Sequence, residues 1–545
     1  MGTIELSLAM LAAVVVSGLL IRVLPFALPT PLVQIALGAS IAAFSGHGVR
    51  LEPDIFFLLF LPPLLFLDGW RIPKEGLLRD KGIILELALG LVIFTVIGVG
   101  LFIHWMIPAM PLPVAFALAA IVSPTDPVAV SSITSRVPLP RRAMHVLEGE
   151  SLLNDASGLV CFRLAVAATL TGAFSPSAAA LTFLQLALGG VAIGTGLTFV
   201  VMRGKNWISK RFGEETGSQV LISLLIPFAA YQLAEHANCS GILAAVSAGI
   251  MMSYMELSGS ALGQTRMQRT AVWNTIQFAL NGIMFVLLGE QLPELLSGAV
   301  NAVQEANHMN PWWLAVYVLA INFALAALRF LWVWVSLRFT AFLAKLRGQP
   351  ATTKPNLRLL AAFSVAGVRG AITLAGVLTL PLMLDDGTPF PTRDLAIVLA
   401  AGVVVLSLLA ASICLPRLMQ DLTMPDESIH GAEEDRARVT AAEAAIKAIE
   451  QTMHELVSSR GDADLYTEAA TRAMDAYRRR IEGHQQMGEG GIRVRQLEEM
   501  ERRIRLAGVR AERETIFALA RRQALSDAGA RKLVRELDLL EERLS

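Results

Sequence analysis

The sequence predicts an all-α, polytopic membrane protein of about 13 transmembrane helices, followed by a soluble helical domain. Hydrophobic residues make up 54% of the 545 residues and occur in runs of roughly 20, the length at which a helix crosses a bilayer. Short loops, many of them basic, separate these runs. Near Pro425 the composition changes to Arg, Glu and Ala with few aromatic residues. We therefore divide the chain into a membrane domain, 1–423, and a cytoplasmic helical tail, 424–545.

Composition argues against several other classes of protein. The 46 basic and 46 acidic residues balance, which gives no electrostatic support for a nucleic-acid partner. The three cysteines, Cys161, Cys239 and Cys414, lie far apart in apolar runs and lack the spacing of a disulfide framework or a zinc site. The first apolar run has neither the basic start nor the cleavage site of a signal peptide, so we interpret it as a span.

The apolar runs give the predicted spans in chain order. They lie at about 5–24, 29–45, 54–70, 82–107, 113–132, 146–172, 179–202, 218–235, 239–256, 270–296, 312–336, 358–384 and 392–418. Lys and Arg are concentrated in the loops after spans 3, 5, 7, 9 and 11, whereas the loops after spans 4, 6, 8 and 10 contain none. Arg50 and Arg393 run against this trend. Because positive residues favour the cytoplasmic side, we expect an external N-terminus and a cytoplasmic C-terminus.

Span 3 carries an acidic residue, Asp68, directly after the run Phe60-Leu-Pro-Pro-Leu-Leu-Phe-Leu. A carboxylate near the cytoplasmic end of a span can be an interface group that reaches toward the lipid headgroups. It can instead line the cytoplasmic mouth of a pathway through the protein. Both interpretations are open at this point.

Span 5 contains Ser123-Pro-Thr-Asp126-Pro, which cannot form a regular helix because proline lacks an N–H and restricts the preceding residue. A broken backbone at membrane depth must line a cavity or be buried in protein. The freed carbonyls and the Thr125 hydroxyl are hard oxygen donors of the kind that hard cations prefer. Asp126 either binds such a cation or neutralises helix N-termini at the break.

Span 6 places Ser151, Asn154 and Asp155 on one helical face, at i, i+3 and i+4. Burial favours the protonated form of Asp155, whereas a nearby cation favours the ionised form. A carboxyl group balanced between these states holds either a proton or a cation. This competition is the minimum chemistry for exchange, so Asp155 is the predicted titrating residue, and Asn154 and Asp126 are predicted to take part with it in proton/cation coupling.

Two further charges in the apolar spans are predicted to form a pair. Glu150 lies in span 6, and Arg329 is the arginine in the apolar interior of span 11. Because an unpaired buried charge is destabilising by several kcal/mol, roughly 3–5, we expect a Glu150–Arg329 ion pair between the two spans. Arg163, also in span 6, has no partner that the sequence identifies.

Span 12 contains Gly367-Val-Arg369-Gly370, where the glycines permit an unwound turn and Arg369 is a charge at depth. Interruptions in spans 5 and 12, in opposite halves of the chain, are typical of secondary transporters with inverted repeats and a site at the midplane. Arg369 would neutralise helix C-termini where the broken helices cross. Asn281 in span 10 is either a neighbour of this site or an amide satisfied within the bundle.

The tail shows helical periodicity with charged faces, for example at 441–450 and 497–506. It is either a stabilising or dimer-supporting domain or a regulatory sensor. Its sequence contains no nucleotide-binding loop and no metal-ligand cluster.

Together these motifs resemble the bacterial sodium/proton exchangers of the cation:proton antiporter-1 family, the NhaP type, which are related to animal sodium/proton exchangers. The resemblance covers about residues 5–420 and rests on Phe60 to Asp68, Ser123-Pro-Thr-Asp-Pro-Val-Ala-Val, Gly149-Glu-Ser-Leu-Leu-Asn-Asp155, Ser240-Gly-Ile-Leu-Ala and Gly367-Val-Arg-Gly-Ala-Ile. It implies a homodimer of thirteen-span subunits in the bacterial inner membrane, each with a dimer domain and a core domain that moves to give alternating access.

The resemblance also implies roles for particular residues. It implies cation contact at Asp155, Ser151, Thr125 and Asp68, with Asp126 in the broken crossing and a buried pair at Glu150 and Arg329. The Asn154-Asp155 pair is similar to that of electroneutral one-for-one exchangers, whereas electrogenic relatives carry Asp-Asp. The resemblance to the family implies no role for the tail.

The predicted function is therefore a secondary antiporter that exchanges Na⁺ for H⁺ and regulates cytoplasmic pH and Na⁺, without a cofactor. Li⁺ or K⁺ can take the place of Na⁺, which leaves a K⁺/H⁺ antiporter as an alternative. A cation channel would need a continuous pore with a charged or carbonyl ring. An enzyme is not expected, because the sequence has no nucleophile–base or metal-ligand motif.

Overall fold

The structure is a computed structural model. It describes residues 3–23, 29–45, 53–79, 81–126, 130, 141–172, 176–256, 262–305, 312–346, 357–384, 387–419, 428–459, 463–485, 489–522, 525 and 527–544. In these ranges the regular secondary structure is helical, apart from an isolated β-bridge between Met383 and Pro389. The chain forms two compact units, Met1–Thr423 and Met424–Ser545.

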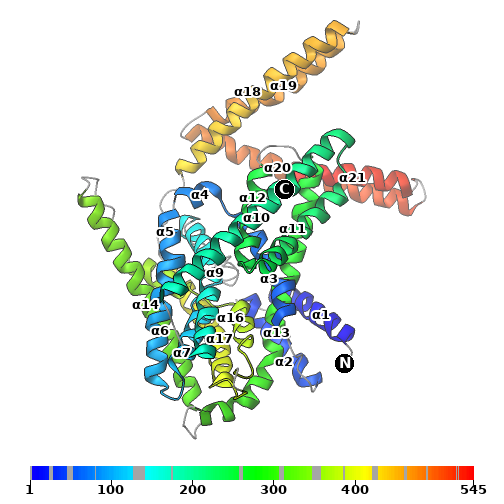
Figure 1. Cartoon of the computed structure of the whole chain (residues 1–545). Helices are drawn as coiled ribbons and strands as arrows, with labels where there is room; N and C mark the ends of the chain where they lie inside the picture. Colours follow the sequence, from blue (N-terminus) through cyan, green and yellow to red (C-terminus); the bar gives the residue numbers. More distant parts are fainter. Residues whose placement is uncertain are drawn as a thin grey trace. The chain divides into compact units, whose positions relative to one another are not determined.

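Helices occupy every predicted span of the first unit (Figure 1). In chain order they are α1 (Thr3–Val23), α2 (Thr30–Ser45), α3 (Pro53–Arg71), α4 (Lys74–Arg79), α5 (Lys81–Leu85), η1 (Glu86–Leu91), α6 (Val92–Met106), α7 (Leu112–Val122), α9 (Arg141–Thr171), α10 (Pro176–Phe212), α11 (Thr216–His236), α12 (Gly241–Glu256), α13 (Gly263–Glu305), α14 (Trp312–Leu346), α15 (Leu357–Val365), α16 (Ala371–Leu378) and α17 (Arg393–Met419). Seven helical stretches are long and apolar enough to cross a bilayer, and shorter apolar helices accompany them.

The local structure differs from the prediction in the fourth span. Instead of one uniform α-helix, the chain forms α5, a π-helical segment η1 and then α6. A π-helix shifts backbone hydrogen bonding to i+5, which composition does not reveal. Ser157 on α9 donates a hydrogen bond of 2.6 Å to the carbonyl of Ala88 in η1. The short helix α4, in a predicted loop, is a second difference.

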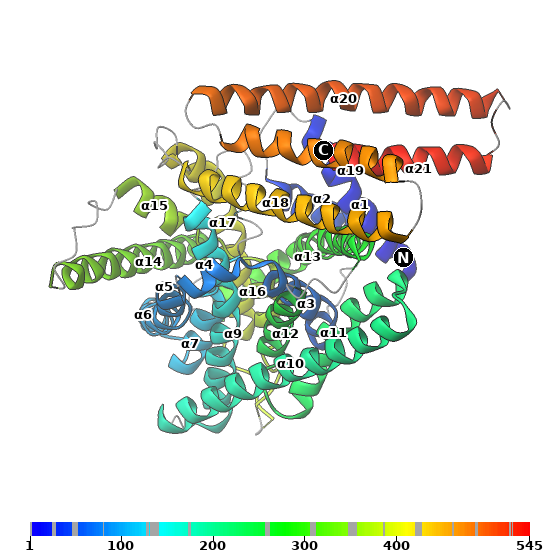
Figure 2. The same ribbon diagram turned by 90° about the horizontal axis from the view of Figure 1, so that it is seen from above.

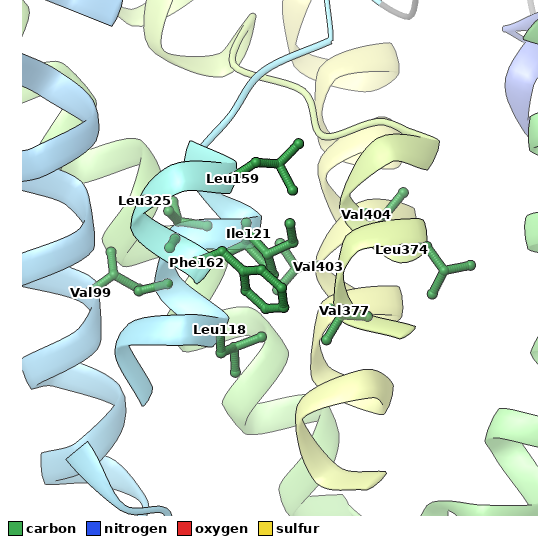
Figure 3. Packing of buried hydrophobic residues seen from close by; sticks show 14 of the residues in the cluster. Val99, Leu118, Ile121, Leu159, Phe162, Leu325, Leu374, Val377, Val403 and Val404 are labelled. Carbon is green, nitrogen blue, oxygen red and sulfur yellow. The ribbon is translucent and has the colours of Figure 1, made fainter. Parts of the chain in front are cut away.

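The main hydrophobic core lies between α6, α7, α9, α14, α16 and α17. In the close view of Figure 3, Ile121 on α7 and Phe162 on α9 lie beside Val403 on α17. This core packs around the ends of α7 and α16, which border the two breaks in the chain. The packed side chains fix where these breaks lie in the bundle.

A second group of helices, α2, α3, α12 and α13, is held together by close backbone contacts at glycines. A Cβ atom on Gly38 of α2 would lie 1.9 Å from the carbonyl oxygen of Val286 on α13. A Cβ atom on Gly249 of α12 would lie 2.1 Å from the carbonyl oxygen of Phe66 on α3. Small residues at helix contacts permit this approach, which brings α3 and α13 to the site described below.

The second unit contains α18 (Ser428–Ser459), α19 (Ala463–Gln485), α20 (Glu489–Arg521) and α21 (Asp527–Leu544) (Figure 2). Helix α18 pairs with α19, and α20 pairs with α21. Arg513 on α20 donates hydrogen bonds to Glu541 and, at 2.9 Å, to Asp538 on α21. The hydrogen bond from Arg513 is the main cause of the lowered pKa of Glu541. These pairs are partly exposed, so buried apolar side chains, including Val509 on α20 and Leu537 on α21, carry most of the packing.

Candidate cation site at the crossing of two broken helices

The predicted break in span 5 begins where α7 ends. The helix stops at Val122, and Ser123 to Asp126 are not helical. The second break lies between α15 and α16, where residues 366–370 are unwound. The backbone N–H of Asp126 donates a hydrogen bond of 2.7 Å to the carbonyl of Val368, so the two broken segments meet.

Charged side chains lie at the helix ends that these breaks expose. Arg369 donates from Nε to the carbonyl of Val122, the last residue of α7, at 2.9 Å, and from Nη1 to the carbonyl of Gly367. Asp126 lies beside Gly370, the N-cap of α16: a Cβ atom there would be 2.1 Å from Asp126 Oδ2. A cation at the carbonyl end of one helix and an anion at the N–H end of another both oppose the helix dipoles.

Helix α9 presents the predicted polar face to the first break. Ser151 Oγ donates to the Thr125 carbonyl at 2.6 Å, and Asn154 Nδ2 donates to Thr125 Oγ1 at 3.0 Å. All three residues are buried. Asn154 Oδ1 is buried without a hydrogen-bond partner among the described residues. A buried oxygen of this kind is available to another donor or to a cation.

A cavity of about 40 Å³ lies at this crossing. Its lining residues are Leu64, Leu65, Asp68, Pro124, Thr125, Asp126, Ser151, Asp155, Gln277, Asn281, Met284, Gly370, Ile372 and Thr373. Roughly 10–15 Å³ is enough for one water molecule, so the cavity has room for a monovalent cation with part of its hydration shell. Its three carboxylates come from α3, the first break and α9.

The cavity therefore brings together residues that are far apart in the sequence. Asp68 is half-buried at the cavity, and Asp155 is buried there. Asn281 also lines the cavity. Gln277, one helical turn before Asn281, lines the cavity too and is not among the predicted site residues. Two amides at i and i+4 in an apolar run were the available signal.

Glu150 and Arg329 form a buried ion pair outside the cavity lining. Arg329 donates from Nη1 and Nη2 to the two carboxylate oxygens of Glu150 at 2.5 and 2.7 Å. Its Nε donates to the carbonyl of Phe363 at 3.1 Å. The side chains are 4% and 1% exposed, so the pair links α9 to α14 and α15 in the protein interior.

Two other arginines that the sequence left unexplained have contacts in the structure. Arg163 lies 3.4 Å from Glu235 on α11, with 53% of its side chain exposed. Arg393, which ran against the loop-charge trend, donates to the carbonyls of Leu380 and Leu378 at 2.9 and 3.4 Å. Arg393 therefore stabilises the C-terminal end of α16. Arg50, the other exception, lies outside the described residues.

Comparisons with known proteins agree with this architecture. The family described as "Sodium/hydrogen exchanger, transmembrane" matches residues 9–421. The chain is 40% identical to a protein of Escherichia coli K12 described as an uncharacterized Na⁺/H⁺ exchanger, YjcE, over 98% of each chain. It is 39% identical to the sodium, potassium, lithium and rubidium/H⁺ antiporter of Bacillus pumilus, over 98% of this chain and 77% of that one.

Among solved structures, the sodium proton antiporter MjNhaP1 of Methanocaldococcus jannaschii is similar in fold. The match has a TM-score of 0.55 at 17% sequence identity and covers 77% of this chain and 99% of the other. The family match over residues 9–421 and the full-length similarity to the E. coli protein lead to one conclusion. This chain belongs to the sodium/hydrogen exchanger family and is a cation/proton antiporter, not an enzyme.

Proposed function

We propose that the protein exchanges Na⁺ for H⁺ at the cavity between α3, α9, α13 and the two breaks, with Asp155 as the coupling residue. The observation that carries this proposal is the placement of Asp155 at the cavity, beside the broken end of α7. No described group donates a hydrogen bond to its carboxylate. The carboxylate therefore takes either a proton or a cation as its partner.

The remaining ligands of the proposed site are oxygens near Asp155. Thr125 and Ser151 line the cavity, and Asn154, next to Asp155 in the sequence, has a buried amide oxygen without a described partner. Hard oxygen donors of this type suit an alkali cation. Asn154 also donates to Thr125 Oγ1, so it holds the break against α9. In this proposal Asn154 shapes the site while Asp155 changes its protonation state.

The cavity also bears on the roles of Asp68 and Asp126. Asp68 lines the same cavity as Asp155, which favours a pathway acid over a residue at the lipid interface. Asp126 lines the cavity and lies at the N-cap of α16. We assign Asp126 mainly to charge compensation at the crossing, together with Arg369, because the helix end provides a constant positive partner.

The organisation of the whole transporter is part of the same proposal. Residues 1–423 would cross the inner membrane about 13 times as inverted repeats, with the N-terminus outside and the C-terminus inside. The protein would be a homodimer that works by alternating access, and residues 424–545 would be a cytoplasmic tail. Exchange would be electroneutral, as the Asn154-Asp155 pair indicates, and would adjust cytoplasmic pH and Na⁺. Because the Bacillus relative is described with four alkali cations, K⁺ and Li⁺ are further candidate substrates.

Proton flux in proteoliposomes tests this function. The purified protein is reconstituted with an internal pH dye, and Na⁺, Li⁺ and K⁺ are added in turn, with and without a membrane potential. We expect cation-dependent flux that is insensitive to the potential. D155N should reduce the flux to that of empty liposomes while the protein still folds.

The matched control is D394N, since Asp394 is an acid with 63% of its side chain exposed. This variant should exchange like the wild type. Retained exchange in D155N would exclude Asp155 as the coupling residue, and a response to membrane potential would exclude one-for-one exchange.

A further inference from the structure

Arg71 is a basic residue next to the proposed site, and the family resemblance gives it no role. It is the last residue of α3, almost one turn beyond Asp68. Its Nη1 donates a hydrogen bond of 2.6 Å to Gln277 Oε1, and its Nη2 donates to Asn274 Oδ1. Both acceptors are on α13, so the guanidinium joins the end of α3 to α13.

The acceptors belong to a polar strip that leads into the cavity. Asn274, Gln277 and Asn281 lie at i, i+3 and i+7 on α13, which places them on one helical face. Asn274 is exposed, whereas Gln277 and Asn281 are half-buried and line the cavity. Met284, the next residue of this face, is buried at the cavity. The strip therefore runs along α13 from the exposed Asn274 to the cavity, with Arg71 at its outer end.

Arg71 differs in the sign of its charge from the acidic residues near Asp68. Asp126 and Asp155 line the same cavity as Asp68 and are like charges, whereas Arg71 is the basic residue in the last turn of α3, at i+3 from Asp68. The neighbouring Lys74 is engaged elsewhere: its ammonium donates to the carbonyl of Ser253 at 2.6 Å and lies over the Tyr254 ring. The facing residues Gln277, Asn281 and Thr373 on α13 and α16 are uncharged.

We propose that Arg71 is a tethered competitor of the transported cation at the mouth of the cavity. Its guanidinium binds the amide oxygen of Gln277 and acts on the carboxylate of Asp68, and a cation that enters along the strip needs the same two groups. An amide oxygen is a suitable ligand for an alkali cation, but a guanidinium on that oxygen repels the cation. Arg71 therefore lowers the apparent cation affinity, and Gln277 is an affinity-determining residue. This inference rests on the proposed function of the cavity.

The test measures the apparent KM and the maximal rate for Na⁺ in everted membrane vesicles, whose outer face is the cytoplasmic side. R71Q removes the charge and should lower KM by about two- to tenfold, with little change in the maximal rate. R71K keeps the charge and should restore a KM near that of the wild type. Q277L removes the shared oxygen and should raise KM.

The matched control is R163Q, which removes the charge of an exposed arginine outside the cavity lining. Its KM should stay near that of the wild type. Raising the ionic strength with choline chloride should reduce the difference in KM between R71Q and the wild type, because salt screens the charge of Arg71 at the exposed mouth of the cavity. A solely structural role of Arg71 predicts instead that R71K behaves like R71Q and that the maximal rate falls in both.

Other outcomes also decide the question. An unchanged or raised KM in folded R71Q would overturn the inference. If R71Q does not fold, a wild-type KM in Q277L would overturn it independently. If the wild-type protein shows no cation-dependent flux, the proposed function is wrong. Failure of the Arg71 inference can therefore be distinguished from failure of the proposed function.

Discussion

At the scale of single residues, the interior of the first unit contains acids with opposite roles. Glu150 accepts two hydrogen bonds from Arg329 and lies outside the cavity. Asp155 lines the cavity without a described hydrogen-bond donor. A carboxylate with a permanent cationic partner links helices and stabilises the fold, whereas one that faces a cavity can exchange its partner. Burial by itself does not separate these two roles; the contacts do.

This difference predicts the effect of removing Arg329. R329A leaves Glu150 as an uncompensated buried charge and frees the Phe363 carbonyl, so the loss of stability should be about 3–5 kcal/mol. The double variant E150L/R329M should lose less, because no charge is left unpaired. Thermal unfolding of the purified variants in detergent measures both.

R163A is the control for this prediction, because Arg163 is 53% exposed and its partner Glu235 is only half-buried. It should change stability by at most about 1 kcal/mol. Equal melting temperatures for R329A and R163A would show that the buried pair contributes no more than a surface pair.

At the scale of structural elements, the crossing depends on the close approach of two broken segments. Asp126 N–H donates to Val368, Arg369 donates to Val122, and Asp126 lies against Gly370. The position of Gly370 leaves no room for a side chain. The contact with Asp126 is the reason that glycine is required here. The backbone conformation is not the reason, because a φ of −109° is accessible to any residue.

We therefore expect G370A to disturb the crossing. The added methyl group would meet the Asp126 carboxylate and should lower stability by about 1–3 kcal/mol. Because the Asp126 side chain must move, exchange should fall as well. G196A on α10 is the control, as its Cβ would have nothing within 4 Å. In a helix interior this change should be neutral or stabilising by up to about 1 kcal/mol. Wild-type stability and exchange in G370A would contradict the proposed packing of the crossing.

At the scale of the whole molecule, the chain consists of a transporting unit and a helical unit with different chemistry. The first unit holds the cavity, the crossing and the buried pair. The second is formed by paired helices with exposed ion pairs such as Arg505–Glu501. The family match ends at residue 421, close to the boundary between the units at Thr423 and Met424. The groups proposed for exchange therefore all belong to the first unit.

Truncation after Thr423 should therefore leave cation-dependent proton flux measurable in proteoliposomes. We expect the pH or cation dependence of the rate to change if the tail is regulatory, and the melting temperature to fall if it supports the fold. Gel filtration of the truncated protein provides the control for its assembly. Complete loss of flux in a folded, correctly assembled truncation would show that the tail is part of the transport machinery.

Much of the fold could be predicted from the sequence because a bilayer imposes local rules. A helix must be about 20 apolar residues long to cross, so the helices of the first unit can be located from apolar runs. Proline and glycine at membrane depth identify both breaks, since their effect on the backbone is local. The polar face of α9 follows from helical spacing in the same way. The π-helical segment η1 could not be predicted, because it depends on its packing against α9.

A polytopic helical protein, two interrupted helices and carboxylates at depth all follow from the amino-acid sequence. Which of those groups meet depends on the tertiary structure. It brings Asp68 on α3 to the cavity of Asp155 on α9, adds Gln277 from α13 and directs Arg369 to the end of α7. Local patterns specify helices and their faces. Which faces meet depends on packing between helices hundreds of residues apart, where small residues permit close approach.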